Sequence, residues 1–131
     1  MAWDKSLETG IPHIDMQHKE LFRQVDSLLD IKNQNRFQET LSFLERYVVR
    51  HFGDEQRMQA ESKYPKAVAH KTLHDNFVRT FGGLKEKFAR EGHTATNNIE
   101  LHKTTMSWLK DHILVQDKDF AEHYKTQSPT R

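Results

Sequence analysis

The chain has 131 residues, of which 35% are hydrophobic and 30% charged, so it can form one domain with its own core but hardly two. Its formal net charge of +1 gives it no electrostatic reason to bind nucleic acid or an anionic membrane surface. Cysteine is absent, which excludes disulfides, thiolate metal sites and iron–sulfur clusters. No apolar stretch approaches the roughly 20 residues of a membrane span, and the first residues do not resemble a signal peptide. We therefore expect a cytoplasmic protein without a membrane span and without a nucleic-acid partner.

Only three prolines and five glycines interrupt the chain, which favours an all-helical fold. Residues 1–12 are predicted to form an N-terminal arm that ends near Gly10 and Pro12. Helices are predicted in chain order at about 14–32, 37–61, 65–91 and 98–115, with room for a short C-terminal helix up to Tyr124 and a frayed tail over 126–131. Because short connections join long helices, we predict a single domain over 1–131, in which residues 13–125 form an up-down-up-down antiparallel four-helix bundle.

Histidines interrupt the apolar stripe of every predicted helix. The polar residues that fall on the inward faces are His18, His51, Glu55, His70, His74 and His112. A single histidine on such a face is usually a hydrogen-bonded core residue. Five imidazoles and a carboxylate without partners would cost several kcal/mol per group. A domain that is stable by about 5–15 kcal/mol could not tolerate that cost. A metal centre removes it, because the nitrogens and oxygens become ligands.

The spacing within two helices suits metal binding. His51 and Glu55 are four residues apart, as are His70 and His74. The members of such a pair lie about 40° apart around a helix and one turn apart along it. Each pair can therefore reach one ion or two adjacent ions.

A further carboxylate ligand is harder to choose. Asp117 follows His112 by five residues, which places it about 140° away on an ideal helix. It would reach the same site only through a loosened or π-like last turn, a feature often found at functional sites. The spacing alone does not favour Asp117 over Asp111 or Asp119.

Four segments resemble a bacterial-type hemerythrin, in order and along almost the whole chain. They are Ile14–Lys19, His51–Glu55, His70–His74 and Trp108–Ile113 followed by Asp117. The early Trp3 also resembles the N-terminal arm of that family. Position 56, which is often a second glutamate in such domains, is Gln56 here, and we expect this difference to leave the ligands untouched.

The resemblance implies a cofactor of two iron ions joined by an oxo or hydroxo bridge. His70, His74 and His112 would bind one iron, His18 and His51 would bind the other, and Glu55 and Asp117 would bridge them. On two roughly six-coordinate irons, these side chains and the oxo or hydroxo bridge together leave one open position, on the iron with two histidines. An open position of this kind suits reversible O2 binding, with O2 held as hydroperoxide in the mechanism of the family.

Reversible binding also needs a dry pocket around the open position. The residues that match the O2 pocket of the family are Leu21, Phe52, Trp108, Leu109 and Ile113. Ordinary core packing is the alternative explanation for these side chains, above all for Leu21 and Phe52. Trp108, one turn before His112, is the best candidate for a gate.

We therefore predict an oxygen-binding protein and not an enzyme, serving oxygen storage, delivery or scavenging. We expect a monomer, with O2 as its ligand and an oxygen-consuming protein as a candidate recipient. One alternative is a di-iron redox enzyme, which should show an electron-donor site or a fused redox domain. A sensor of O2, NO or redox state would need room for an output domain. A structural or iron-storage site is a third alternative, although structural sites are normally closed.

Overall fold

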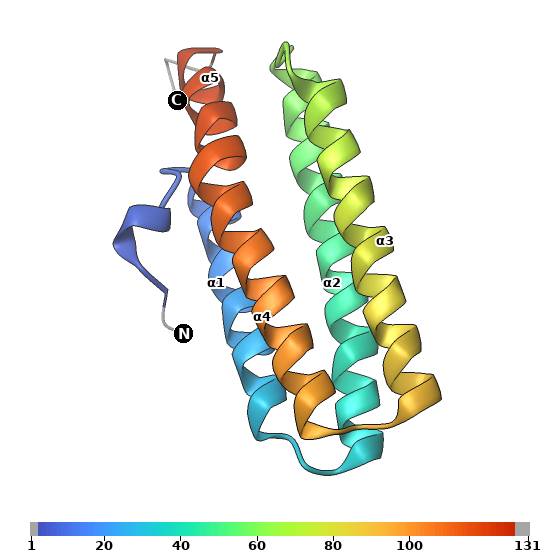
Figure 1. Ribbon diagram of the computed structural model, residues 1–131. Helices are drawn as coiled ribbons and strands as arrows, with labels where there is room; N and C mark the ends of the chain where they lie inside the picture. The colour runs from blue at the N-terminus through green and yellow to red at the C-terminus, as the bar shows by residue number, and fades with distance from the viewer. Residues whose placement is uncertain (1–2, 128–131) are drawn as a thin grey trace.

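The structure is a computed structural model that describes residues 3–127, and every regular element in that range is a helix. The long helices are α1 (Pro12–Ser27), α2 (Gln34–Glu61), α3 (Ala67–Glu91) and α4 (Ala95–Asp111). A π-helical segment, η3 (His112–Asp117), joins α4 directly to α5 (Lys118–Gln127), so that the three form one continuous column (Figure 1). Two short 3-10 turns, η1 (Lys5–Leu7) and η2 (Leu28–Asp30), complete the description.

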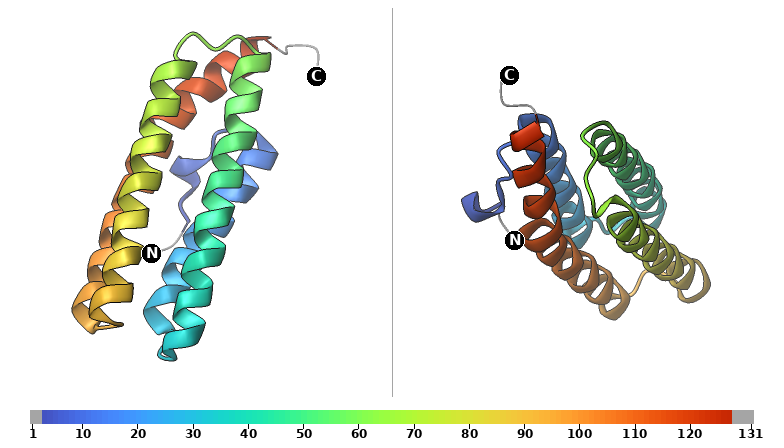
Figure 2. Two further views of the ribbon diagram at one scale, coloured as in Figure 1. Left: turned by 90° about the vertical axis from the view of Figure 1, so that its right-hand side faces the viewer. Right: turned by 90° about the horizontal axis from the view of Figure 1, so that it is seen from above.

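The helices form the predicted antiparallel four-helix bundle. Helix α1 packs against α2 and α4, and α3 packs against the same two helices, so the four columns surround one axis (Figure 2). The all-α, up-down-up-down prediction is confirmed. None of the helices in residues 3–127 is long and apolar enough to cross a membrane.

Local sequence signals set the ends of these helices. The side chain of Asn33 accepts a hydrogen bond from the backbone N–H of Arg36 at the start of α2, and Thr94 caps α4 in the same way through Asn97. Pro12 occupies the first turn of α1, where a missing N–H costs nothing. Gly92 ends α3 with a φ of 86°, a value that favours glycine.

Several predicted boundaries need correction. Pro65 does not open α3: the backbone N–H of Ala67 bonds to the carbonyl of Tyr64, so residues 65 and 66 form a turn before the helix. The first helix changes to a 3-10 turn at Leu28 instead of continuing to residue 32. The C-terminal helix is longer than predicted, because residues 126 and 127, placed in a frayed tail, belong to α5. Residues 1, 2 and 128–131 lie outside the described range.

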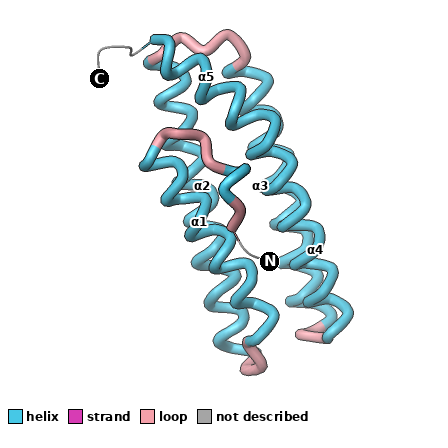
Figure 3. The backbone as a smooth tube through the Cα atoms, turned by 90° about the vertical axis from the view of Figure 1, so that its left-hand side faces the viewer, coloured by secondary structure: helices cyan, strands magenta, loops and turns pink. Residues whose placement is uncertain are grey.

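The N-terminal arm runs along the outside of the bundle beside α1 (Figure 3). Trp3 packs edge-on against Phe22 with ring centroids 5.4 Å apart, and Leu7 is buried in the main core. The Nζ of Lys118 donates a hydrogen bond to the carbonyl of Ser6. The arm is therefore held by packing against α1 and by a hydrogen bond from α5.

Two apolar clusters fill the bundle, with a polar layer between them. The larger cluster contains Leu21 of α1 and Phe77 of α3, and the smaller contains Ile14 of α1 and Phe120 of α5. His18 lies between Ile14 and Leu21 along α1, and the other columns repeat this order. The hydrophobic core thus encloses a short section of the axis where buried polar side chains meet.

Candidate metal centre

Every column of the bundle contributes to the polar layer. The side chains that meet there are His18 from α1, His51 and Glu55 from α2, His70 and His74 from α3, and His112 and Asp117 from η3. All seven are buried. They are the seven residues predicted as ligands, and the structure brings all of them together.

Three histidines converge on one point. The Nε2 atom of His112 lies 3.0 Å from Nε2 of His70 and 3.1 Å from Nε2 of His74. Carboxylate oxygens close the group: Oε1 of Glu55 lies 2.9 Å from Nε2 of His70, and Oδ1 of Asp117 lies 3.2 Å from Nε2 of His112. A neutral imidazole carries one N–H, so three mutually adjacent Nε2 atoms cannot all be paired by protons. A shared cation would satisfy all of them.

A second group uses the same two carboxylates. His18, His51, Glu55 and Asp117 each offer a ligand atom, and these atoms all lie within 4.8 Å of one another. Nε2 of His18 is 3.1 Å from Oδ2 of Asp117. One group thus has three histidines and the other has two, with Glu55 and Asp117 common to both.

Unpartnered buried atoms show that these residues fit metal ions. Within the described residues, Nε2 of His18, Oε2 of Glu55 and both carboxylate oxygens of Asp117 are buried and make no hydrogen bond, although Asp117 lies within ion-pair distance of His18 and His70. Burying such atoms costs free energy unless they are compensated. Imidazole and carboxylate ligands suit iron and other first-row divalent metals. The donor set therefore fits a pair of such ions.

The π-helical segment decides which aspartate joins the site. In η3 the chain from His112 to Asp117 is wound more widely than an α-helix, so a five-residue spacing places both side chains in the interior. Asp111 is exposed. Asp119 accepts a hydrogen bond from the hydroxyl of Tyr64 at the surface of the bundle. The predicted need for a π-like turn is confirmed.

Electrostatics within the metal-free cluster keeps two of the rings neutral. Burial, reinforced by neighbouring histidines, lowers the pKa of His51 to about 3 and that of His74 to about 2. Burial also opposes charge on His70, but the adjacent carboxylates of Asp117 and Glu55 outweigh this and raise the pKa of His70 to about 9. Burial and the charge of Asp117 raise the pKa of Glu55 well above its ordinary value. A proton on His70 therefore sits between the two carboxylates in the metal-free protein.

Metal affinity should rise with pH for this reason. Below pH 9 a metal ion must displace the proton of His70 before that ring can act as a ligand. Each displaced proton contributes about a tenfold change in apparent affinity per pH unit. We expect the Co²⁺ affinity of the metal-free protein to fall at least about tenfold per unit between pH 8 and pH 6, as titrations at several pH values would measure. An affinity independent of pH in this range would contradict a protonated His70.

Two glutamines contact ligand rings, which the sequence pattern did not reveal. The Nδ1–H of His74 donates to Oε1 of Gln56 at 3.1 Å, so the expectation that position 56 leaves the ligands untouched is wrong. The Nδ1–H of His51 donates to Oε1 of Gln17 at 2.6 Å. Each glutamine is the chain neighbour of a ligand but contacts a ring on another helix, and helical periodicity within one segment cannot show such a contact.

The predicted pocket residues lie in or against the larger apolar cluster, and two of them stack on ligand rings. Leu21, Phe52, Leu109 and Ile113 are buried in the larger apolar cluster, and the half-buried Trp108 packs against it. The ring of Phe52 stacks on His74 with centroids 3.7 Å apart. Trp108 stacks on His112 at 4.4 Å and lines a surface hollow between α3 and η3. These contacts place Phe52 and Trp108 beside the three-histidine group, and His112 itself lines the same hollow as Trp108.

The fold and the site together define a class: a helical bundle with a buried histidine–carboxylate centre for two metal ions. The family model of the hemerythrin HHE cation binding domain matches residues 9–124. The chain belongs to the hemerythrin family. Membership in this family supports O2 binding at a di-iron site, and the predicted di-iron cofactor is confirmed.

Similar proteins span nearly the same length. A myohemerythrin of Theromyzon tessulatum is 32% identical over 111 residues, which cover 85% of this chain and 82% of the relative. A bacteriohemerythrin of Pseudomonas aeruginosa is 28% identical over 125 residues, covering 93% and 80%. A crystal structure of wild-type hemerythrin superposes with a TM-score of 0.85 at 29% identity, covering 95% of this chain and 97% of the other. The likeness therefore includes the whole bundle.

Proposed function

We propose that this protein binds O2 reversibly at a di-iron centre held by the seven buried ligands. His70, His74 and His112 would hold one iron, His18 and His51 the other, and Glu55 and Asp117 both. The observation that carries the proposal is the unequal division of histidines around two shared carboxylates, three on one side and two on the other. This inequality would leave the two-histidine iron the more open to an external ligand.

When bound, the iron pair supplies the electrons and the open coordination position for O2. The chain supplies the surroundings. The rings of Phe52 and Trp108 stack on His74 and His112 of the three-histidine group, and the ring of Phe52 also lies 5.8 Å, centroid to centroid, from His51 of the two-histidine group. Leu21 and Ile113 are buried in the same apolar cluster as Phe52. Excluding water in this way would slow loss of the bound oxygen and oxidation of the irons, which favours release over turnover.

A carrier is therefore proposed in preference to a di-iron enzyme or a sensor of O2, NO or redox state. The burial of the seven ligands supports this choice, because a reductase must bring protons to the bound oxygen. The hydroperoxide form of bound O2 and the gating role of Trp108 stay predictions. So do the cytoplasmic location, the monomeric state, the oxygen-consuming recipient and the choice between storage, delivery and scavenging.

Visible absorption of the iron-loaded, anaerobically reduced protein tests the proposal. A charge-transfer band should appear on exposure to air and disappear under argon, over repeated cycles. His18→Ala should abolish the cycle, whereas His102→Ala, which changes a histidine bonded to Asp26 outside the cluster, should preserve it. Prompt and irreversible conversion to the oxidised spectrum in the unaltered protein would contradict the carrier function and favour a redox enzyme or sensor.

A further inference from the structure

Two ligand rings are anchored by side-chain amides. Gln17 accepts the Nδ1–H of His51 across the α1–α2 interface, and Gln56 accepts the Nδ1–H of His74 across the α2–α3 interface. An acceptor at Nδ1 fixes the tautomer of a neutral histidine and directs its Nε2 lone pair toward a metal. Both glutamines therefore present the ring in the form that a metal ion requires.

The two anchors are divided between the two ligand groups. His51 belongs to the two-histidine group and His74 to the three-histidine group. By contrast, Nδ1 of His18 and Nδ1 of His70 are buried without a hydrogen-bond partner in the described part of the chain. Each group thus contains one ring that a glutamine orients and at least one that only packing orients.

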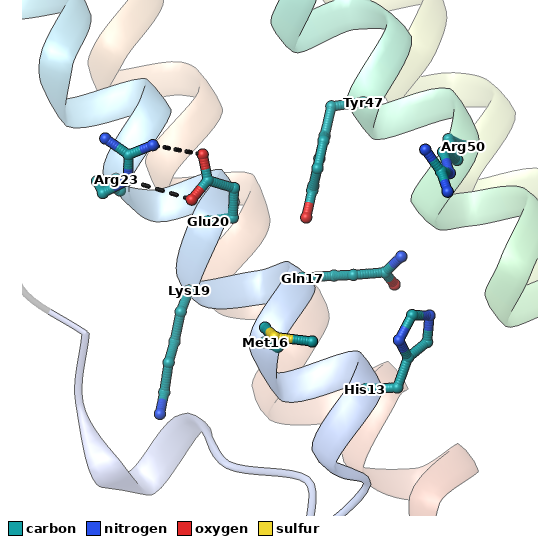
Figure 4. Close-up of a pocket in the computed structure, with 8 residues that line it drawn as sticks. All are labelled: His13, Met16, Gln17, Lys19, Glu20, Arg23, Tyr47 and Arg50. Atoms are coloured by element: carbon teal, nitrogen blue, oxygen red, sulfur yellow. Dashed lines mark hydrogen bonds and ion pairs between the residues drawn. The ribbon is translucent and has the colours of Figure 1, made fainter.

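The orientation of Gln17 is itself fixed by its neighbours. Its Nε2 donates to Oδ2 of Asp54 at 3.0 Å, and Oδ1 of Asp54 accepts from Arg57 at 3.2 Å. Because the amide nitrogen is held by a carboxylate, the amide oxygen must face His51. Gln17 lies at the floor of the groove between α1 and α2, where its side chain reaches across below Tyr47 (Figure 4).

We propose that Gln17 and Gln56 are positioning residues, one for each metal, and that their neutral amides keep carboxylate charge off the ligand rings. The proposal rests on the proposed two-iron centre. Histidine ligands commonly donate to a carboxylate, which raises the basicity of the ring. In this chain His51 donates to the amide of Gln17, and that amide donates to the carboxylate of Asp54. The carboxylate therefore reaches His51 only through the neutral amide. Less basic rings stabilise the oxidised irons less, so the reduced pair persists between cycles of oxygen binding.

Stepwise metal titration tests the division of the two anchors. We expect metal-free wild-type protein to bind two Co²⁺ ions, the tighter at the three-histidine group. Gln56→Leu should weaken the tighter step, and Gln17→Leu the weaker step, by about 10–100-fold each, the usual effect of losing an outer-shell partner. Gln38→Leu, on α2 but 13 residues before His51 in the sequence, is the matched control and should change neither.

The outcomes separate the inference from the proposed function. Suppose that the wild type binds two Co²⁺ ions. If the two variants then weaken neither binding step, or both weaken the same step, the positioning role alone is overturned. Fewer than two ions bound by the wild type would overturn the two-metal site and the inference with it. Gln56→Glu keeps an acceptor for the Nδ1–H of His74, so this variant should bind Co²⁺ at the tighter step without the loss expected for Gln56→Leu. A folded, helical Gln56→Glu variant with the same loss would also overturn the positioning role.

A charge exchange tests the role of the neutral amide. In the double variant Gln17→Glu/Asp54→Asn, the amide introduced at position 54 can still accept from Arg57 and donate to position 17, so the hydrogen bonds and the net charge persist. The negative charge moves from position 54 to position 17, where the new carboxylate accepts the Nδ1–H of His51. The reduction potential of the iron pair should fall, and the oxygenated form should oxidise faster, relative to both wild type and Asp54→Asn. An unchanged potential would overturn the proposed effect of the amide.

Discussion

Removing both metal ions should lower the melting temperature of this protein by about 10–20 °C. The metal-free bundle buries five imidazoles and two carboxylates in one layer, with several of their polar atoms unpartnered. A metal present at 1,000 times its dissociation constant stabilises the folded state by about 4 kcal/mol. In a domain of this size, each kcal/mol corresponds to a few degrees. Calorimetry of the metal-free protein, before and after two equivalents of metal, measures the difference.

A variant without the shared carboxylates provides the control. Glu55→Gln/Asp117→Asn removes both charges and should no longer respond to metal. Its metal-free form should melt at a temperature close to that of metal-free wild type, because the loss of two buried charges offsets the loss of their pairing with His70. If metal did not raise the melting temperature of the wild type, the polar layer would be stable on its own and the physical basis for the metal site would be lost.

Sequence periodicity sufficed for the fold because each helix buries one stripe. Apolar residues such as Leu21 on α1 and Phe77 on α3 belong to stripes in which apolar side chains recur every three or four positions. The histidines occupy the gaps in these stripes. Helix ends were less predictable. Pro65 suits a first helical turn, yet Tyr64 is buried in the smaller cluster, and its carbonyl closes a turn instead. Packing of a neighbouring residue thus overrode a local preference.

The site was predictable where its residues share a helix face and unpredictable where they do not. His70 and His74 lie four residues apart and face one way on any α-helix. Gln17 and Gln56 gain their roles from rings on other helices, which depend on how the helices are rotated against one another. Asp117 depends on a π-helical segment, which widens one turn without any distinctive residue to announce it.

The three aspartates that the sequence could not separate should therefore differ sharply on substitution. Asp117→Ala should remove a ligand from both groups, reduce the bound metal from two ions to one or none, and abolish the oxygen-dependent absorption band. Asp111→Ala changes an exposed side chain and should leave metal content and spectrum unaltered. Asp119→Ala removes the partner of the Tyr64 hydroxyl and should cost about 1 kcal/mol of stability without affecting the metal.

Metal analysis and spectra of the three variants, prepared in parallel, distinguish the π-helical arrangement from an ordinary helix. On an uninterrupted α-helix, position 117 would lie about 140° from His112, on a different face of the column, and its loss would be no worse than that of position 111. A large effect at Asp117 alone requires the wider turn. Equal effects at Asp111 and Asp117 would mean that η3 does not direct Asp117 to the metals, and the shared-carboxylate geometry would have to be abandoned.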